Sequence, residues 1–276
     1  MAKDEERIRG SVASLWRYPV KSMLGEELNA SDVTERGLLG DRAYALVDAE
    51  TGKVVSAKDP RKWGRMFDFR AAFDEPPRDP RWLPPVRITS PDGTPWSSDR
   101  ADIDQRLSEG VGRPVRLTAS APEGASIDGY WPDLDWLAAR DETFEVPLPP
   151  GTFFDSAVIH LVTTATLDRL RKIAPQGRFE TRRFRPNLVV EVADGAEGFV
   201  EDAWVGRALA IGDDVLIRVT EPCPRCVMTT LPQGDLPKDP SILRATVEHH
   251  GGNVGVLAWV IRGGRVHRGD SVTRDD

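Results

Sequence analysis

Residues 158–173 of the chain read VIHLVTTATLDRLRKI, and the spacing of their apolar side chains changes partway along. Val158–Val162 is a β-branched and apolar run of the kind that forms a buried strand. Thr164–Ile173 then carries apolar residues at helical spacing, and Thr163 or Thr164 is positioned to cap the first helical turn. The sequence therefore predicts a strand that leads directly into a helix.

Closely spaced strands are predicted after this unit. The apolar runs are Leu188–Val192, Ala208–Ile211, Val215–Val219, Val254–Ile261 and Arg265–His267. Two similar turns, Ile211-Gly212-Asp213 and Arg268-Gly269-Asp270, contain a glycine that can supply the positive φ of a tight turn. This pattern favours a closed or nearly closed β-barrel.

The N-terminal half also consists mostly of predicted strands. Arg42–Asp48 and Lys53–Ala57 are expected to pair as a hairpin across residues 49–52. The other predicted elements are strands at Val12–Trp16, Val86–Thr89 and Val115–Thr118 and a helix at Ile103–Glu109. We therefore expect a mostly β fold with some α-helix, of the α+β class.

Residues 121–150 show no sustained helical or strand period and are rich in Pro, Asp, Glu and Trp. Such a segment is typical of a linker or a long functional loop. We accordingly predict an N-terminal β-rich domain over residues 1–120, a linker or active-site loop over 121–150, and a C-terminal β-barrel domain over 151–276, packed against each other.

The chain has 276 residues, a net charge of −7 and a pI near 5.3, which argues against a nucleic-acid-binding protein. Basic residues do gather within Glu180–Asn187, either as a site for a small anionic ligand or as a solvated basic face. The charged start, MAKDEERIRG, does not resemble a secretory signal, and His249–Ile261 is too short to span a membrane. We expect a soluble, cytoplasmic protein with no membrane or nucleic-acid partner.

The segment Glu221–Thr230, EPCPRCVMTT, contains both cysteines of the chain. A C-x-x-C pair can be half of a zinc site, a redox pair, or the source of one thiolate ligand for another metal. Zinc is disfavoured because the histidines do not have finger-like spacing, and a redox pair is disfavoured because Val227–Pro232 is expected to continue as an extended segment. A single ligand and two inert thiols both remain open.

Further polar motifs recur along the chain. Tyr18-Pro19-Val20-Lys21-Ser22 and Gly40-Asp41-Arg42 are weak signals on their own. Phe184-Arg185-Pro186-Asn187 is more specific, because the arginine offers a planar fork for a carboxylate or phosphate and the proline stiffens the backbone beside it.

Taken in order, YPVKS, GDR, VTTATL, FRPN and CxxCVMTT resemble the MOSC (molybdenum cofactor sulfurase C-terminal) family. The resemblance extends to its branch that contains the mitochondrial amidoxime reducing component and bacterial relatives. It implies an N-terminal MOSC-associated β-barrel domain followed by the MOSC domain. It also implies a molybdenum–pyranopterin cofactor whose metal is held by the second cysteine of the motif, Cys226, a soft thiolate donor.

The resemblance also implies the residues around this cofactor. Asp155 matches a position where the family often has an acidic residue near the metal, and a purely structural role for it is left open; with Cys226 it forms the predicted catalytic pair. The positions implied as cofactor contacts are Lys21, Ser22, Arg42, Thr163, Thr164, Arg182, Arg183, Arg185 and Asn187.

The leading functional hypothesis is an oxidoreductase that reduces small N-hydroxylated compounds with electrons from a separate flavoprotein, ferredoxin or cytochrome, because the chain carries no fused cysteine-rich electron-transfer domain. The alternative is a non-catalytic protein that carries molybdenum cofactor or sulfur. Pyridoxal phosphate binding also occurs in the family, in sulfurases fused to such domains, but no long pyridoxal-phosphate domain is recognised here. A dithiol protein without metal is the third hypothesis.

Overall fold

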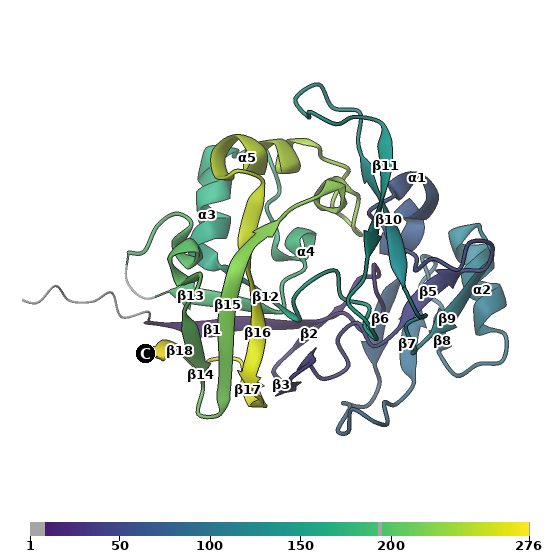
Figure 1. Ribbon diagram of the computed structural model, residues 1–276, viewed down its shortest axis with the longest axis horizontal. Coiled ribbons are helices and arrows are strands. Elements are labelled where there is room, and N and C mark those ends of the chain that lie inside the picture. The colour runs from purple at the N-terminus through teal and green to yellow at the C-terminus, as the bar shows by residue number, and fades with distance from the viewer. Residues whose placement is uncertain (1–8, 193–194, 276) are drawn as a thin grey trace, which may run out of the picture.

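A closed barrel forms the left-hand part of the molecule in Figure 1. The computed structural model describes residues 9–192 and 195–275. Most of the segment MAKDEERIRG, which does not resemble a secretory signal peptide, therefore lies outside the described residues. Seven strands close the barrel through successive pairings that return from β13 to β1. In barrel order they are β1 (Arg9–Arg17), β13 (Leu188–Val192), β12 (Ile159–Thr163), β16 (Asn253–Arg262), β15 (Val215–Pro224), β14 (Ala208–Ile211) and β18 (Ser271–Asp275).

One pairing in this barrel is parallel, between β12 and β13, and the other pairings are antiparallel. A ring with an odd number of strands cannot close on antiparallel pairs alone, because strand direction would not match after one circuit. A parallel pair in turn needs a crossover connection. Helices α3 (Thr164–Ile173) and α4 (Thr181–Phe184) supply it, which is why a strand leads directly into a helix at residue 164.

The first turn of α3 is fixed by the predicted cap. Thr163 has extended backbone angles, and its hydroxyl oxygen accepts a hydrogen bond from the Thr166 amide at 3.1 Å. The same hydroxyl donates to Glu201 on η2 (Val200–Trp204) at 2.7 Å. Burial raises the pKa of the Glu201 carboxyl, which lies among the Thr163 and Thr166 hydroxyls.

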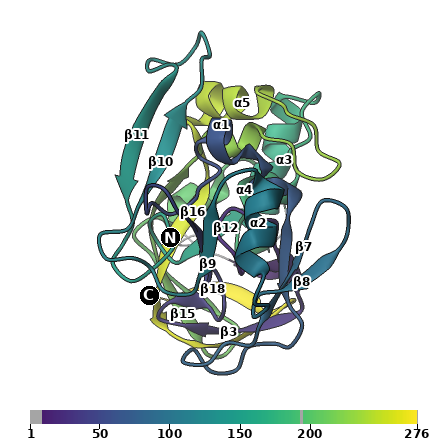
Figure 2. The same cartoon turned by 90° about the vertical axis from the view of Figure 1, so that its right-hand side faces the viewer.

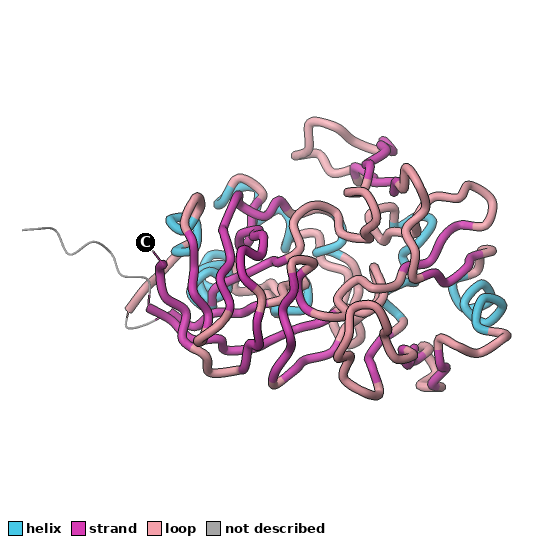
Figure 3. The backbone as a smooth tube through the Cα atoms, turned by 60° about the horizontal axis from the view of Figure 1, so that its bottom comes forward, coloured by secondary structure: helices cyan, strands magenta, loops and turns pink. Residues whose placement is uncertain are grey.

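Inside the barrel, apolar side chains from every barrel strand form one core, which includes Leu15, Leu161, Leu209, Ile217 and Val256. A second cluster, built around Leu170 and Phe184, joins the barrel wall to the crossover and to α5 (Ser241–His250). Figure 3 shows the strands concentrated in this part of the molecule, with helices lying against its outside. The barrel is therefore a packed support rather than a channel.

The N-terminal strand β1 belongs to the barrel, and the chain then passes into a smaller region on the right of Figure 1. Here β5 (Ala45–Asp48) pairs with β9 (Val115–Thr118), and β6 (Arg70–Phe73), β7 (Val86–Thr89) and β8 (Pro95–Ser97) form a separate sheet. Its helical segments are α1 (Pro60–Trp63), η1 (Gly64–Asp68) and α2 (Ile103–Val111). This region has its own core, which includes Phe67, Phe69 and Leu107 and extends to Val227. Four short strands stay with the barrel instead: β2 (Glu26–Leu28) pairs with β1, and β3 (Ala30–Thr34), β4 (Gly37–Leu38) and β17 (Gly264–His267) form a small sheet that contributes to the barrel core.

These observations confirm the mostly β, α+β fold class and the closed barrel. The strands predicted at 86–89, 115–118, 188–192 and 208–211 and the helix predicted at 164–173 have the bounds expected from the sequence. Gly212 and Gly269 both have positive φ, as the two turns required. The predicted strands in the barrel were detectable because each combines a buried apolar face with a glycine or polar turn at its end.

The predicted hairpin of residues 42–48 and 53–57 is shorter than expected. The two segments do pair, but only over a short stretch: the Val47–Val54 bridge is flanked by hydrogen bonds from the Asp48 amide to the Lys53 carbonyl and from the Val55 amide to the Leu46 carbonyl, while the longer ladder of β5 is with β9. Arg42 lies outside the strand, in a left-handed conformation. The short local pairing lies on one edge of β5, and the longer ladder with β9 lies on its other edge.

Residues 121–150 are also more ordered than expected. They contain an antiparallel pair, β10 (Ser126–Trp131) and β11 (Glu142–Pro147), which projects as an arm from the rest of the molecule (Figures 1 and 2). The alternation is hard to read in the sequence because Gly129 takes an inward position, where the ring of Phe144 fills the space of a side chain.

The segment after the cysteines differs from the expectation too. Val227–Thr230 is a 3₁₀ turn, η3, rather than an extended continuation, and it ends before Pro232. The threonine side chains favour it, because Thr229 and Thr230 donate their hydroxyls to carbonyls three residues earlier. A redox C-x-x-C pair is expected to be followed by an α-helix, and this single short turn is not one. The redox pair therefore stays disfavoured, although the segment is a turn rather than the expected extended chain.

The buried histidine His160 of β12 gives a test of this fold through the pH dependence of stability. Burial, reinforced by the charges of Arg225 and Arg42, lowers the pKa of its ring to about 3. Below about pH 6 the unfolded chain therefore takes up a proton that the folded protein refuses, and the free energy of unfolding falls by about 1.4 kcal/mol per pH unit from this residue. His160→Gln should lose less stability than wild type between pH 7 and pH 4 in urea unfolding.

His249→Gln is the matched control, because that side chain is exposed near the end of α5. It should show the wild-type dependence on pH. A His160→Gln protein whose stability falls as steeply as that of wild type would contradict the assignment of a neutral, buried ring.

Candidate functional site

The loop that follows β1 brings the YPVKS motif to the boundary between the barrel and the smaller region. Val20 forms a parallel bridge with Tyr44, and the Arg42 amide donates to the Tyr18 carbonyl at 2.9 Å. The Ser22 hydroxyl accepts a hydrogen bond from the Ala57 amide at 3.1 Å. Two motifs that are separate in the sequence, YPVKS and GDR, therefore lie against each other.

Left-handed backbone gathers in these same motifs. Ser22, Arg42 and Arg185 have φ values of 65°, 47° and 55°. Non-glycine residues rarely adopt this conformation, and it persists only where the surrounding contacts fix it, often at functional sites. The one other non-glycine residue with positive φ in the described part of the chain, Asp141, lies in the turn of the β10–β11 arm.

Asp155 is held between two lysines. Its carboxylate accepts from Lys21 Nζ at 2.5 Å and pairs with Lys58 Nζ at 2.9 Å, while Lys21 also donates to the Phe153 carbonyl at 2.6 Å. Asp155 is partly shielded from water by its surroundings, which would raise its pKa, but the two ammonium charges outweigh this and hold the pKa of Asp155 well below its usual range. The carboxylate is therefore ionised at neutral pH.

The two lysines respond differently to this arrangement. Burial lowers the pKa of Lys21, against the opposing charge of Asp155. Burial also acts on Lys58, but the charges of Asp155 and of the Cys226 thiol raise its pKa above the ordinary value. Lys58 was missed in the sequence because it stands in an irregular segment with no motif around it, and only the fold brings it near Cys226.

Tyr18 lies against two guanidinium groups. The Arg42 carbon Cζ is 4.6 Å and that of Arg185 is 4.2 Å from the centre of its ring, within the range of cation–π contacts. Arg42 pairs with the buried carboxylate of Asp41, whereas Arg185 donates to the Met23 carbonyl at 2.6 Å and forms no ion pair with the described residues. Burial and the nearby charge of Arg42 lower the pKa of Arg185 to about 10.

The two cysteines lie in different surroundings. Cys223 is buried, and burial raises the pKa of its thiol, although Arg225 opposes this by donating to the sulfur at 2.8 Å. Arg225 also donates to the Phe184 carbonyl, which ties the cysteine loop to the crossover. Cys226 is partly exposed. Of the two, Cys226 is the thiol that a ligand can reach.

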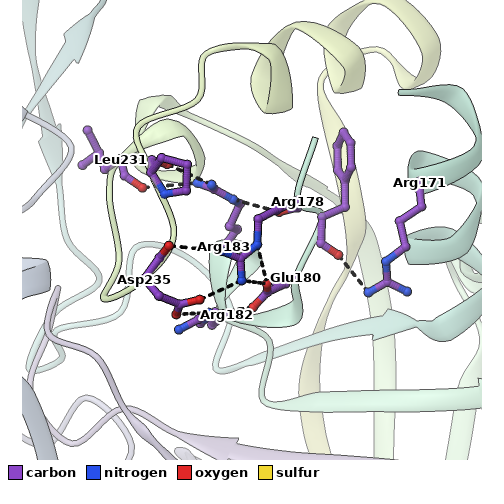
Figure 4. Close-up of polar contacts among 9 residues, drawn as sticks. Arg171, Arg178, Glu180, Arg182, Arg183, Leu231 and Asp235 are labelled. Carbon is purple, nitrogen blue, oxygen red and sulfur yellow. Dashed lines mark hydrogen bonds and ion pairs between the residues drawn. The ribbon is translucent and has the colours of Figure 1, made fainter. Parts of the chain in front are cut away.

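Some residues predicted to contact the cofactor use their side-chain polar atoms in hydrogen bonds or ion pairs within the protein. Arg183 is fully buried and donates to the carbonyls of Arg178, Thr229, Leu231 and Pro237 (Figure 4). Arg182 pairs with Glu180 and Asp235. These contacts fix the crossover, and the sequence alone did not distinguish them from ligand contacts.

Thr163 and Asn187 are likewise occupied. Thr163 is fully buried and bonded to Glu201, and Thr164 is the first residue of α3, with no side-chain hydrogen bond among those found in the described residues. Asn187 uses its amide to hold Asp41, the Trp16 carbonyl and the His160 amide. Asn187 therefore positions Asp41, and through it Arg42, rather than facing a cavity.

A cavity of about 450 Å³ opens beside Arg42 and is also lined by Phe153, Phe154, Arg36 and Trp82. It lies next to the Lys21 and Asp155 pair through Phe153. Within residues 9–192 and 195–275, no three His, Cys, Asp or Glu side chains come together as a metal-ligand set. No helix in that part of the chain is long and apolar enough to cross a membrane.

Comparison with known proteins identifies the family to which this chain is similar. The model of the MOSC N-terminal β-barrel domain matches residues 9–79, and that of the MOSC domain matches residues 149–273. Mitochondrial amidoxime reducing component 2 of Rattus norvegicus is 28% identical over 245 residues, which cover 80% of this chain and 67% of that protein. The same component of Macaca fascicularis is 30% identical over 244 residues with the same coverage, and component 1 of Homo sapiens is 25% identical over 244 residues, or 80% and 66% of the two chains. The chain therefore belongs to the MOSC family, with a MOSC N-terminal β-barrel domain followed by a MOSC domain.

Proposed function

We propose that this protein binds a molybdenum–pyranopterin cofactor at Cys226 and reduces small N-hydroxylated compounds. The observation that carries the proposal is the excess of partly buried cations beside an accessible thiol. Lys21, Lys58, Arg42, Arg185 and Arg225 share the site with two carboxylates, Asp41 and Asp155. Membership of the MOSC family, with relatives named amidoxime reducing components, supports the same assignment.

The residues present fit such a cofactor on chemical grounds. A pterin phosphate and a dithiolene are anionic, and buried or half-buried cations without a full set of counter-charges are stabilised by an anion. Arg185 has no carboxylate partner among the described residues, and its planar fork can bind a phosphate through parallel hydrogen bonds. The thiol of Cys226 is a soft donor suited to molybdenum.

When bound, the cofactor would supply the metal that passes electrons from the redox partner to the substrate and accepts the oxygen. Converting an N–OH group to N–H plus water consumes two electrons and two protons. Asp155 is ionised and cannot supply a proton, so we assign it to positioning the two lysines. Burial lowers the pKa of Lys21, which makes its ammonium the stronger acid of the pair and the group that holds a proton ready at Nζ.

The electrons come, in this proposal, from a separate redox protein such as a flavoprotein, ferredoxin or cytochrome. That the substrate is a small N-hydroxylated compound rests on the family resemblance. The proposed cytoplasmic location rests on the composition of the sequence. The cavity beside Arg42 is large enough for a small planar substrate, since ligand sites begin at roughly 300 Å³.

Retention of the cofactor tests the assignment of the metal ligand. Protein expressed in a host that makes the cofactor should contain molybdenum and pterin, measured by elemental analysis and by fluorescence of the oxidised pterin. Cys226→Ser should lose most of the metal, whereas Cys223→Ser should retain most of it, because Cys223 is buried and bonded to Arg225. Equal loss in both variants would indicate a dithiol pair instead.

Substitutions of two neighbouring arginines should distinguish an effect on cofactor binding from an effect on stability. Arg185→Gln should weaken cofactor retention during dilution, by about tenfold or more for the loss of a charge-assisted contact, and leave the melting temperature of the apo-protein nearly unchanged. Arg183→Gln should do the reverse, because Arg183 is fully buried and donates to four carbonyls of the protein, whereas Arg185 donates to one. Full cofactor occupancy of Arg185→Gln after prolonged dialysis would count against its role.

Turnover tests the reaction. Cofactor-loaded protein supplied with a low-potential artificial donor should reduce benzamidoxime or 6-hydroxylaminopurine, and a physiological reductant such as NADH should give little turnover until a redox partner is added. Protein that holds a full complement of molybdenum yet reduces none of several N-hydroxylated compounds would overturn the reductase proposal. A carrier of the cofactor would then be the better reading.

A further inference from the structure

A second cavity, of about 380 Å³, lies on the crossover side of Tyr18 and Arg185. Four arginines line it, contributed by β6 (Arg70), α3 (Arg171), α4 (Arg182) and the residue that ends α4 (Arg185), while Glu180 is its one carboxylate. This is a concentrated positive surface in a chain whose net charge is −7. Such a local potential attracts anions even when the whole protein repels them.

Two of these arginines already have counter-charges. Arg171 pairs with Asp168 at 2.7 Å and donates to the Phe179 carbonyl at 2.9 Å, and Figure 4 shows it directed toward the crossover backbone. Arg182 is held by Glu180 at 2.7 Å and by Asp235 at 2.5 Å. They form a fixed wall with most of their charge neutralised.

The other two guanidinium groups, those of Arg70 and Arg185, have no carboxylate counter-charge among the described residues. Arg70 donates to the Gly25 carbonyl at 3.2 Å and Arg185 to the Met23 carbonyl at 2.6 Å, and neither forms an ion pair within the described part of the chain. Arg185 is only 7% exposed. Arg70 is exposed, so it can swing toward a ligand at the mouth of the cavity. The buried charge of Arg185 without a counter-charge is costly, so an anion that enters the cavity would offset a cost that the empty protein already carries.

The remaining walls are aromatic. Trp16 is half-buried at the end of β1, and the ring of Tyr18 is fixed because its hydroxyl donates to the Pro186 carbonyl at 3.2 Å. An aromatic face beside a guanidinium suits a ligand that carries an anionic group on a planar or apolar body. The volume of the cavity is enough for a small molecule and too small for a macromolecular segment of any length.

We propose that this cavity is a binding site for a small phosphate monoester with an aromatic or apolar body, its phosphate held between Arg70 and Arg185 and its body against Trp16. The site shares Tyr18 and Arg185 with the cluster near Cys226, but the proposal does not require a bound molybdenum cofactor. It adds a second anion site, whose cavity is not lined by Cys226, Lys21 or Lys58.

Isothermal titration of the apo-protein with inorganic phosphate and with phenyl phosphate, at constant ionic strength in chloride, tests this proposal. Phenyl phosphate should bind more tightly than inorganic phosphate. Arg70→Gln should weaken both by about tenfold or more, and Arg70→Lys should recover part of the affinity because lysine keeps the charge but lacks the planar fork. Trp16→Leu should reduce the preference for phenyl phosphate and leave inorganic phosphate nearly unchanged.

Arg87→Gln is the matched control, because Arg87 lies on β7, pairs with Asp74 at 2.9 Å and is not among the residues lining the cavity. It should bind phosphate as wild type does. Only variants whose melting temperature equals that of wild type are compared, so that a loss of binding does not reflect unfolding. Cys226→Ser should also bind phosphate normally, which separates this result from the proposed reductase function. Binding that is unchanged in Arg70→Gln, or no binding of either anion at millimolar concentration, would overturn the proposal.

Discussion

The parallel pairing of β12 with β13 is the constraint on which the rest of the structure depends. It lets a seven-strand ring close, and it obliges the chain to leave the barrel and return through α3 and α4. Arg185 and Asn187 stand where the chain returns. Because β1 pairs with the start of β13, Leu15 opposite Leu188, the loop that carries Tyr18 and Lys21 begins at the same place. Closure of the barrel thus assembles motifs that are far apart in the sequence.

The site that results stores positive charge close to a reachable thiol, and the backbone fixes it there. Arg42 and Arg185 hold left-handed conformations and lie against the same tyrosine ring, while Asp155 balances only the two lysines. Groups held in this way need little rearrangement when an anion arrives, so less of the binding energy is lost in ordering the site.

Local patterns in the sequence predicted most of the barrel, because each strand there buries one face and ends at a turn residue. They failed where the structure depends on distant partners. Ala45 at the start of β5 pairs with Thr118 at the end of β9, far along the chain, and no local pattern specifies that partner. Arg183 and Arg185 are nearly adjacent and chemically identical, and only the fold separates the structural cation from the one without a counter-charge. Lys58 could not be found before the fold placed it beside Asp155.

X-ray absorption at the molybdenum edge is the measurement that most directly tests the central claim, which is that Cys226 anchors the cofactor in a site built by barrel closure. Wild-type protein should show sulfur scattering from the dithiolene and from one additional thiolate. The small amount of metal retained by Cys226→Ser should have one sulfur neighbour fewer, and Cys223→Ser should give the wild-type spectrum. A Cys226→Ser spectrum with the same number of sulfur neighbours as wild type would contradict the account.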